Sequence, residues 1–250
     1  MVTNTSRRFE QRSVIVTGAC GGIGLATARR FASEGARVAL VDHGVDMRAA
    51  VAACSAAGAS DVIAIDCDVA TEHQVIDACA QVLQRFGAID VVVNIAGMMV
   101  FKPLTELDRA DWQRVLGVNL LGAAYFTRQA LRHMGQGGAI VNVASVHARA
   151  TTPLVAAYAA SKAGLLSLTR SAAIEGKPLG IRANAILPGA VDTPMLWSNP
   201  NLKSGAETIA PEDVGTPDAI AAAIAFLASS DAAFVSGASL DVDGGRLAKL

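Results

Sequence analysis

The sequence predicts an α/β fold, with one doubly wound parallel sheet of seven strands flanked by helices on both faces. Short β-branched runs alternate with helical patterns along all 250 residues, and these runs are continuously apolar. Continuous apolar strands indicate a parallel sheet that is buried on both faces. The alternation of strands and helices favours the doubly wound arrangement. Because no linker, repeat or low-complexity stretch interrupts the chain, we expect a single domain over residues 1–250.

The expected elements follow one another in a regular order. The strands are the apolar runs at residues 13–17, 37–41, 62–65, 91–94, 139–144, 182–187 and 239–242. Helices are expected at residues 22–35, 46–57, 72–86, 108–134, 156–175 and 217–228. The segment at about residues 190–216 breaks this order with several Pro, Asn and Gly residues. Loops of this length usually bind ligands, so we predict a substrate loop at the carboxyl edge of the sheet.

The composition excludes several classes of protein. Apolar residues make up 52% of the chain and charged residues 17%, which supports a large core and argues against disorder. A net charge of −1 offers no basic field to nucleic acid or to an anionic membrane. No apolar stretch is long enough to span a bilayer, and the polar N-terminus does not resemble a signal peptide. The four cysteines form no CxxC pair and match no zinc spacing, so we expect a cytoplasmic protein with reduced thiols and no metal.

A glycine-rich turn follows the first expected strand, in the order Thr17-Gly18-Ala19-Cys20-Gly21-Gly22-Ile23-Gly24. Gly18 allows a tight turn, Gly22 lets the backbone approach a pyrophosphate, and Gly24 lets the helix pack close to the strand. The helix that follows offers N–H groups and its positive dipole end to phosphates. We therefore predict a Rossmann-type dinucleotide site with contacts from Gly18, Cys20, Gly21, Gly22, Ile23 and Gly24.

Acidic residues at the ends of two strands indicate how the adenosine is held. Asp42 would accept hydrogen bonds from both ribose hydroxyls and would repel a 2′-phosphate. His43, rather than an arginine, follows Asp42, so we expect contacts from both residues and NAD rather than NADP as the cofactor. Asp68 and Val69 follow the third strand and are expected to contact adenine, although a lone Asp there is more often a cap for the next helix.

Acid–base chemistry is expected from two residues on the helix at 156–175. Tyr158 and Lys162 stand four positions apart, which places them on one face. A tyrosine has a pKa of about 10, and a lysine cation nearby lowers it, so the phenol can exchange a proton with an alcohol or a carbonyl. Ser145 ends the fifth strand, where its hydroxyl can bond a substrate oxygen. Asn119 interrupts a helical pattern; a local kink that holds a water is one interpretation, and a solvent-facing side chain is the other.

Together these motifs resemble the classical short-chain dehydrogenase/reductase family, and the resemblance covers nearly the whole chain. It comprises the TGxxxGxG turn, the YxxxK pair, Asn119, Ser145, and the turns Asn94-Ile95-Ala96-Gly97, Pro188-Gly189 and Asp243-Gly244-Gly245. Ile95 departs from the family pattern, which usually has a second asparagine at that place.

The resemblance implies an NAD(H)-dependent oxidoreductase that interconverts a secondary alcohol and a ketone. It implies a catalytic tetrad of Asn119, Ser145, Tyr158 and Lys162, with Tyr158 as the general acid or base. Lys162 would also hold the nicotinamide ribose, Ser145 would position the substrate oxygen, and Asn119 would hold a water. Further cofactor contacts are implied at Asn94, Ala96, Gly97, Pro188, Gly189, Val191 and Thr193. Family members are mostly homotetramers, so the helices at 108–134 and 156–175 are expected to form a dimer interface.

The substrate pocket is expected from residues that follow the cofactor segments, namely Met98, Met99, Val146, His147, Leu154, Met195, Leu196 and Trp197. Most of these residues are apolar, which favours an apolar or cyclic alcohol over a free sugar. His147 would give the substrate a polar contact, and a solvent-facing histidine is the alternative.

Three other functions stay open at this point. A sugar or polyol dehydrogenase of the same family would use the same chemistry. A non-catalytic NAD-binding sensor would not need the four tetrad residues, all of which are present. An epimerase or dehydratase with retained NAD is usually longer, because it carries an added substrate domain.

Overall fold

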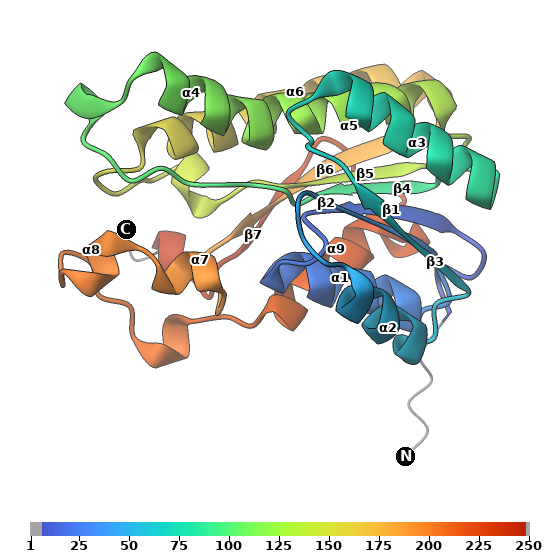
Figure 1. The fold of residues 1–250 in the computed structure, drawn as a ribbon, viewed down its shortest axis with the longest axis horizontal. Helices are drawn as coiled ribbons and strands as arrows, with labels where there is room; N and C mark the ends of the chain where they lie inside the picture. Colours follow the sequence, from blue (N-terminus) through green and yellow to red (C-terminus); the bar gives the residue numbers. More distant parts are fainter. Residues whose placement is uncertain (1–6, 249–250) are drawn as a thin grey trace.

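The computed structural model describes residues 7–248 and confirms the predicted seven-stranded parallel sheet (Figure 1). The strands are β1 (Ser13–Thr17), β2 (Arg37–Asp42), β3 (Asp61–Asp66), β4 (Val91–Asn94), β5 (Ala139–Val143), β6 (Arg182–Pro188) and β7 (Ser239–Val242). They lie in the order β3-β2-β1-β4-β5-β6-β7, and every neighbouring pair is parallel. The order reverses between β1 and β4, and in such sheets ligands bind in the crevice outside the carboxyl ends at this point.

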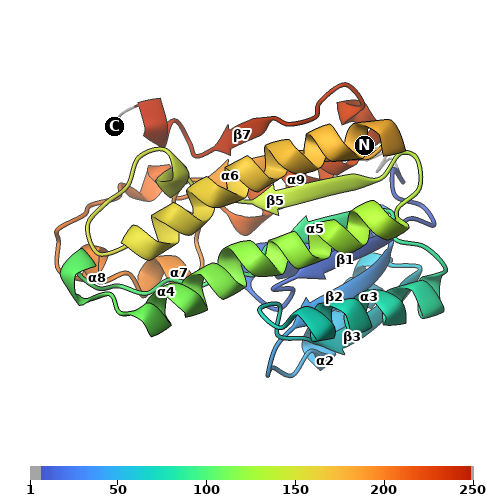
Figure 2. The same ribbon diagram turned by 90° about the horizontal axis from the view of Figure 1, so that it is seen from above.

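Helices cover both faces of the sheet, as predicted. One face carries α1 (Gly22–Ser33), α2 (Arg48–Ala57) and α9 (Pro217–Ala228). The other face carries α3 (Glu72–Phe86), α4 (Arg109–Leu116), α5 (Gly122–His133) and α6 (Ala156–Gly176) (Figures 1 and 2). Two short helices, α7 (Pro194–Trp197) and α8 (Pro200–Lys203), lie in the loop after β6. Within residues 7–248, no helix is both long and apolar enough to cross a membrane.

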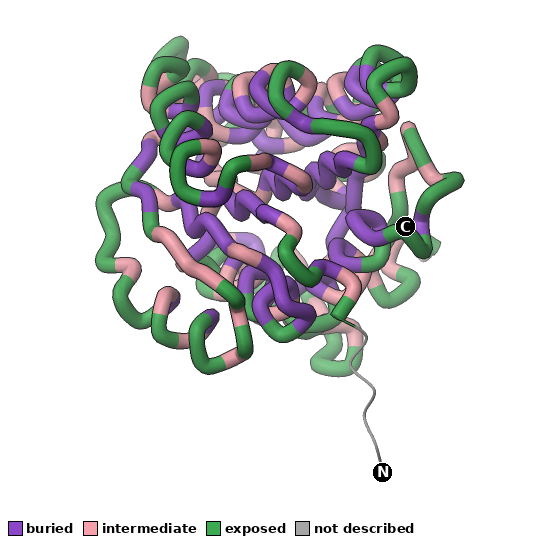
Figure 3. Tube along the Cα trace, turned by 90° about the vertical axis from the view of Figure 1, so that its right-hand side faces the viewer, coloured by how far each residue is buried: buried purple, intermediate pink, exposed green. Residues whose placement is uncertain are grey.

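Alternate side chains of β1 supply the two halves of the core. Every residue of β1 is buried. Val14 and Val16 pack with residues of α1, α2 and α9, whereas Ile15 packs with residues of α3, α5 and α6. Side chains point alternately to the two faces of a strand, so a continuously apolar strand fills both halves. Figure 3 shows this buried centre beneath exposed helix surfaces and loops.

The predicted helical region over residues 108–134 is present, and the kink expected at Asn119 is a π-helical turn. A π-helical turn at Gly117–Leu121 separates α4 from α5, although Figure 2 shows the two helices in one line. Asn119 lies in this turn and is 1% exposed, which rules out the solvent-facing interpretation of its side chain. Single π-helical turns inside α-helices are frequent at functional sites.

The two short helices in the loop at 190–216 were not predicted. Each has a proline at its first turn, Pro194 and Pro200, where the missing N–H costs no hydrogen bond. Asn199 caps α8, because its side chain accepts a hydrogen bond from the backbone N–H of Asn201 at 3.0 Å. Four residues are too few to produce a periodic signal in the sequence.

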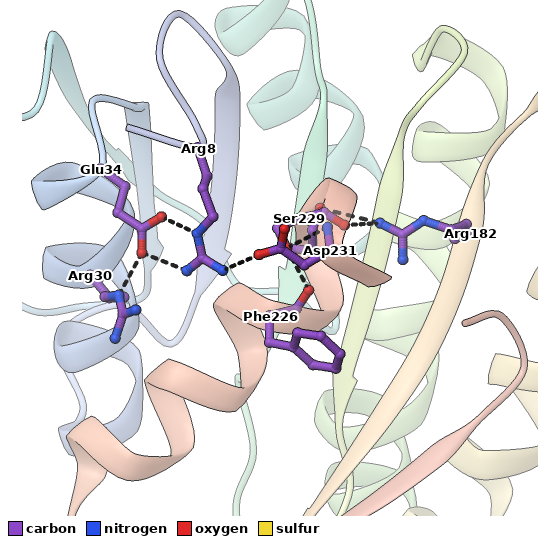
Figure 4. A network of polar contacts seen from close by, with 8 residues as sticks. Arg8, Arg30, Glu34, Arg182, Phe226, Ser229 and Asp231 are labelled. Carbon is purple, nitrogen blue, oxygen red and sulfur yellow. Dashed lines mark hydrogen bonds and ion pairs between the residues drawn. The ribbon is translucent and has the colours of Figure 1, made fainter. Parts of the chain in front are cut away.

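A buried carboxylate ties the beginning of the described chain to α1 (Figure 4). Glu34 is 3% exposed and accepts hydrogen bonds from Arg8 Nε at 2.6 Å, Arg8 Nη2 at 2.7 Å and Arg30 Nε at 2.6 Å. Arg8 Nη1 also donates to Asp231 Oδ2 at 3.0 Å, which links the loop after α9 to the same network. Burial alone would raise the pKa of Glu34, but the hydrogen bonds from Arg8 and Arg30 outweigh burial and lower it.

Glu34→Gln should lower the free energy of unfolding at pH 7 by about 2 kcal/mol, because both guanidinium groups lose their carboxylate partner. The folded-state pKa of Glu34 lies below its ordinary value of 4.5, so its stabilisation is present above that pH and is lost as the pH falls through the folded-state pKa. Urea unfolding at pH 7 and at low pH should therefore show a difference from the unaltered protein that shrinks in acid.

Glu10→Gln is the matched control, because Glu10 forms an exposed ion pair with Arg7 and its loss should change stability little. An equal loss of stability for Glu34→Gln at both pH values would contradict this role of the Glu34 carboxylate.

Candidate active site

A cleft of about 670 Å³ opens at the carboxyl ends of the strands, where the strand order reverses. The structure brings nearly all of the predicted cofactor contacts into it. The lining includes Gly18, Cys20, Gly21, Gly22, Ile23, Gly24, Asp42, His43, Asp68, Val69, Ala96, Gly97, Tyr158, Lys162, Pro188, Gly189, Val191 and Thr193. Segments far apart in the sequence meet here because parallel strands end at one edge.

The glycine turn has the geometry of a phosphate cradle. Gly18 has a φ of +63°, which favours glycine. A Cβ at Gly24 would lie 1.9 Å from the Gly18 carbonyl oxygen, so α1 packs against the turn as closely as predicted. α1 starts after Gly21 without any side-chain cap, and its first N–H groups lack intrahelical partners. These groups and the helix dipole fit the phosphates of a dinucleotide.

Asp42 stands at the end of β2, beside this cradle. Its Oδ2 accepts a hydrogen bond from Cys20 N at 2.8 Å, and its Oδ1 accepts one from His43 N at 2.9 Å. Each carboxylate oxygen can accept a second hydrogen bond, so the group fits ribose hydroxyls. Asp68 organises the turn before α3, because its carboxylate accepts from Ala70 N at 3.0 Å and from Thr71 Oγ1 at 3.3 Å. Asp68 lines the cleft, but it does not cap α3, because the N-cap residue is Thr71 and the helix has no side-chain cap hydrogen bond.

Tyr158 and Lys162 lie on one buried face of α6 at the other end of the cleft. Tyr158 is 8% exposed and Lys162 3%. The Tyr158 hydroxyl and Ser145, which follows β5, both line the cleft, and their interaction acts to lower the pKa of Tyr158 against the effect of burial. Lys162 Nζ donates to Val143 O at 2.8 Å and lies 5.6 Å from the centre of the Tyr158 ring. Two hydroxyls and one ammonium group therefore converge where a substrate oxygen could bind.

The sequence predicted that Lys162 lowers the pKa of Tyr158, but in the structure this pKa is raised. Burial raises the pKa of Tyr158, and the interaction with Ser145 only opposes this effect. Burial also lowers the pKa of Lys162 to about 8. The physical reason is that the ammonium group lies near the ring and bonds a backbone carbonyl, so desolvation of both groups dominates over their mutual attraction.

Asn119 holds the backbone of Met98, in the segment next to Lys162, by hydrogen bonds. Its Oδ1 accepts from Met98 N at 2.8 Å, and its Nδ2 donates to Met98 O and to Ser161 Oγ, both at 3.0 Å. A Cβ added at Gly97 would lie 3.4 Å from Lys162 Nζ and 3.5 Å from Asn119 Oδ1. Gly97 therefore lies at ordinary contact distance from both Lys162 and Asn119. The water predicted at Asn119 stays a prediction.

Asn94 is the one predicted cofactor contact that does not line the cleft. Its Nδ2 donates to Asn142 Oδ1 at 2.8 Å, and Asn142 Nδ2 donates to Thr169 Oγ1 at 2.9 Å. The chain of hydrogen bonds joins β4, β5 and α6 beneath the cleft. Asn94 is thus placed to hold the strands that carry the site.

The predicted substrate residues divide into two groups. Met99, His147, Met195 and Leu196 line the cleft, whereas Met98, Val146, Leu154 and Trp197 do not. Val146 is 2% exposed and points into the core, and Met98 packs in a small cluster under the cleft. The backbone of Leu154 has a φ of +70°, and its carbonyl accepts from Lys102 N. Trp197 is half-exposed, and its Nε1 donates to Asp192 Oδ1 at 2.7 Å.

Several lining residues escaped the sequence analysis, namely Val45, Cys67, Ile95, Val118, Val143, Ala144, Pro194 and Asn199. Asn199 could have been noticed in the sequence, because Asn before Pro favours a turn or the start of a helix. The others are apolar residues, most of them at strand ends, with Val118 in the π-helical turn and Pro194 at the start of α7, and only the tertiary fold decides which of them face the cleft.

Polar contacts fasten the predicted substrate loop beside the cleft. Asn199 Nδ2 donates to Glu207 Oε2 at 3.3 Å, and Arg246 forms an ion pair with the other oxygen of Glu207. Asn201 Nδ2 donates to Pro153 O at 3.1 Å, just before α6. The loop is therefore held both by the C-terminal segment and by the segment that leads to Tyr158.

Comparisons with known proteins agree with this geometry. A family model described as Enoyl-(Acyl carrier protein) reductase matches residues 18–246. The chain is 42% identical over 246 residues to the cis-4-hydroxycyclohexanecarboxylate dehydrogenase of Sinomonas cyclohexanicum, which covers 96% of this chain and 98% of that protein. It is 39% identical over 245 residues to 3beta-hydroxysteroid dehydrogenase 1 of Eggerthella lenta, which covers 94% and 93%.

A solved structure shares the same architecture. The short-chain dehydrogenase from Burkholderia cenocepacia J2315, whose crystal structure is a complex with NADP, superposes with a TM-score of 0.88. The two sequences are 34% identical, and the match covers 95% of this chain and 98% of that one.

Proposed function

The chain belongs to the short-chain dehydrogenase/reductase family, and we propose that it is an NAD(H)-dependent enzyme that interconverts a secondary alcohol and a ketone. Oxidoreduction at a hydroxyl group agrees with the two relatives named above, both of which are dehydrogenases of hydroxylated compounds. The observation that carries the proposal is the meeting of the buried residues Ser145, Tyr158 and Lys162 in a cleft whose far end holds the glycine turn and Asp42.

Tyr158 moves the proton in this proposal. Its hydroxyl donates a proton to the carbonyl oxygen in reduction, and its phenolate form accepts the proton of the alcohol in oxidation. Ser145 holds the same substrate oxygen by a second hydrogen bond. The bound nicotinamide supplies or accepts the hydride. Because burial raises the pKa of Tyr158, the phenol is protonated at neutral pH, and alcohol oxidation should become faster as the pH rises.

Lys162 and Asn119 support these two hydroxyls. An ammonium group has three donors, and one of those of Lys162 is bonded to Val143 O. The remaining donors would hold the nicotinamide ribose hydroxyls. Asn119 fixes the backbone of Met98 beside them, in the segment that would line the nicotinamide.

The proposed cofactor is NAD rather than NADP, because of the Asp42 carboxylate. A 2′-phosphate would meet the Asp42 carboxylate at the end of β2, with no arginine next to it in the sequence. The structural relative in complex with NADP shows that this fold also accepts the phosphorylated cofactor, so Asp42 is the residue on which the choice depends.

The substrate end of the cleft favours a largely apolar or cyclic alcohol, because Met99, Met195 and Leu196 form much of it. His147 adds one polar contact. The Thr151 hydroxyl donates to Thr152 O at 3.4 Å, so it accepts from His147 Nδ1 at 3.3 Å. Nε2 of the neutral ring is then an acceptor, and burial keeps the ring neutral by lowering its pKa. A second hydroxyl on an otherwise apolar substrate would satisfy this acceptor.

We also propose a cytoplasmic homotetramer in which α5 and α6 form a dimer interface. The two helices lie side by side on one outer face of the molecule (Figures 1 and 2). Leu121, just before α5, is 45% exposed, which suits an apolar contact between subunits.

Tyr158→Phe should reduce turnover about 10²- to 10⁴-fold, because it removes the proton donor and leaves the ring packing intact. NADH should still bind, as measured by its fluorescence. Tyr125→Phe is the matched control, since Tyr125 is the only other tyrosine and does not line the cleft. Near-normal activity of Tyr158→Phe would exclude the mechanism, whereas loss of NADH binding as well would point to a folding defect.

Asp42→Ala should weaken NAD binding about tenfold and reduce the difference in affinity between NAD and NADP. The substitution removes two hydrogen-bond acceptors and a charge that repels the 2′-phosphate. Dissociation constants for both cofactors measure this. Asp46→Ala removes the same charge from the loop that follows β2, where the Asp46 side chain bonds Arg48, and should leave the preference for NAD over NADP unchanged. Tighter binding of NADP than NAD by the unaltered protein would overturn the role given to Asp42.

His147→Phe should discriminate between substrates, since it keeps a ring against Tyr158 but removes Nε2. We expect kcat/KM for a cyclic diol to fall about tenfold, while kcat/KM for the matching cyclic monoalcohol changes little. An equal fall for both alcohols would show that His147 acts on Tyr158 and does not bind a second hydroxyl.

A further inference from the structure

His43 stands at the cofactor end of the cleft, where its side chain is held by a residue outside the cleft. It follows Asp42, the last residue of β2, and lines the cleft beside it. Its backbone N donates a hydrogen bond to Asp42 Oδ1 at 2.9 Å. Its ring Nδ1 lies 3.2 Å from Oδ1 of Asp66, which ends β3 and does not line the cleft. Carboxylates from two neighbouring strands thus hold this histidine at the place proposed for the adenosine ribose.

The register of the sheet brings Asp66 to this place. Asp42 and Asp66 are paired residues of the parallel strands β2 and β3, so both carboxylates reach the edge at which the cofactor would bind. β3 is the edge strand farthest from β7 in the strand order, whereas α5 and α6 pack on β4, β5 and β6 (Figure 2). The contact between His43 and Asp66 therefore lies away from the helices proposed for the dimer interface.

The same carboxylate oxygen also fixes the turn after His43. Asp66 Oδ1 accepts a hydrogen bond from Gly44 N at 3.0 Å. Gly44 has a φ of +64°, a conformation that favours glycine. The ring of His43 and the backbone that follows it are thus held by one carboxylate.

Stability does not account for the contact between His43 and Asp66. Their side chains are 63% and 68% exposed, and exposed pairs contribute little to the free energy of unfolding. The contact has a specific consequence for the ring instead, because Asp66 is ionised at neutral pH. The Gly44 N–H and then His43 lower the pKa of Asp66 below its ordinary value of 3.8.

The ionised Asp66 decides which nitrogen of a neutral His43 ring carries the proton. An ionised carboxylate only accepts hydrogen bonds, so Nδ1 is the nitrogen that donates to Asp66. Nε2 is then an acceptor. An acceptor can receive a hydrogen bond from a ribose hydroxyl. It cannot bond a phosphate dianion, whose oxygens are acceptors as well.

We propose that Asp66 sets the preference for NAD over NADP by holding His43 in the tautomer whose Nε2 is an acceptor. This role rests on the proposed function, since it needs a dinucleotide in the cleft. Asp42 excludes the 2′-phosphate by charge, and His43 adds a selection by hydrogen bonding. Without Asp66, a neutral His43 ring is free to carry its proton on Nε2 and to donate to a phosphate oxygen. Asp66 is therefore a positioning residue that acts through His43.

Dissociation constants for NAD and NADP test the proposal at pH 8, where imidazole side chains are mostly neutral. Asp66→Ala should reduce the preference for NAD, measured as the ratio of the two constants, about three- to tenfold. Asp61→Ala is the matched control, because it removes the same charge from the other end of β3, where Asp61 pairs with Arg85. The control should leave the ratio unchanged. An unchanged ratio for Asp66→Ala would overturn the proposal.

His43→Phe separates the ring nitrogens from the charge of Asp66, because phenylalanine keeps a ring and has no nitrogen. In this background, Asp66→Ala should not change the ratio any further, since the two residues act as one unit. An equal change in both backgrounds would show that Asp66 acts by its charge or by fixing Gly44, and the proposal would fail.

Nitrogen-15 NMR of the histidine rings detects the tautomer directly, because protonated and unprotonated ring nitrogens have different chemical shifts. The chain has four histidines, and the signal that His43→Phe lacks identifies His43. We expect the proton on Nδ1 in the unaltered protein and a larger share of it on Nε2 in Asp66→Ala. A proton mainly on Nε2 of His43 in the unaltered protein would contradict the proposal.

These measurements need no turnover, so they separate the role of Asp66 from the proposed function. If the unaltered protein binds NAD and Asp66→Ala leaves the ratio unchanged, only the role of Asp66 fails. If the unaltered protein binds neither dinucleotide, the proposed function fails, and the role of Asp66 fails with it.

Discussion

The parallel alignment of the strands is the constraint on which the rest of the molecule depends. Parallel strands all end at one edge, so the glycine turn after β1, Asp42 on β2 and Ser145 after β5 reach the same cleft. The contact between α1 and this turn is close enough that only glycine fits at position 24. That contact aims the first N–H groups of α1 into the cleft, opposite the buried face of α6 that carries Tyr158 and Lys162.

Features that depend on local chemistry could be predicted from the sequence. The apolar run of β1, the glycine turn and the four-residue spacing of Tyr158 and Lys162 each have a local cause, and the structure agrees with all three. Features that depend on contacts with distant parts of the chain could not be predicted from the sequence. Trp197 turns toward Asp192, and Asn94 bonds Asn142, although the sequence placed one in the substrate pocket and the other beside the cofactor. The π-helical turn at Asn119 could be anticipated only as a kink.

Electrostatics at the reacting end depend more on burial than on charge pairing. Burial raises the pKa of Tyr158 and lowers that of Lys162 to about 8, so both shifts favour the uncharged forms. A phenol held neutral in this way is suited to donate a proton to a carbonyl.

The central claim is that the cleft joins a nicotinamide cofactor to the carbon that bears the substrate hydroxyl. The most direct test is a single turnover with NAD and a cyclic secondary alcohol deuterated at that carbon, followed by mass spectrometry of the dinucleotide. We expect deuterium in the reduced cofactor from the unaltered protein and little product from Tyr158→Phe. Reduced cofactor without deuterium, or equal product from the variant, would contradict the claim.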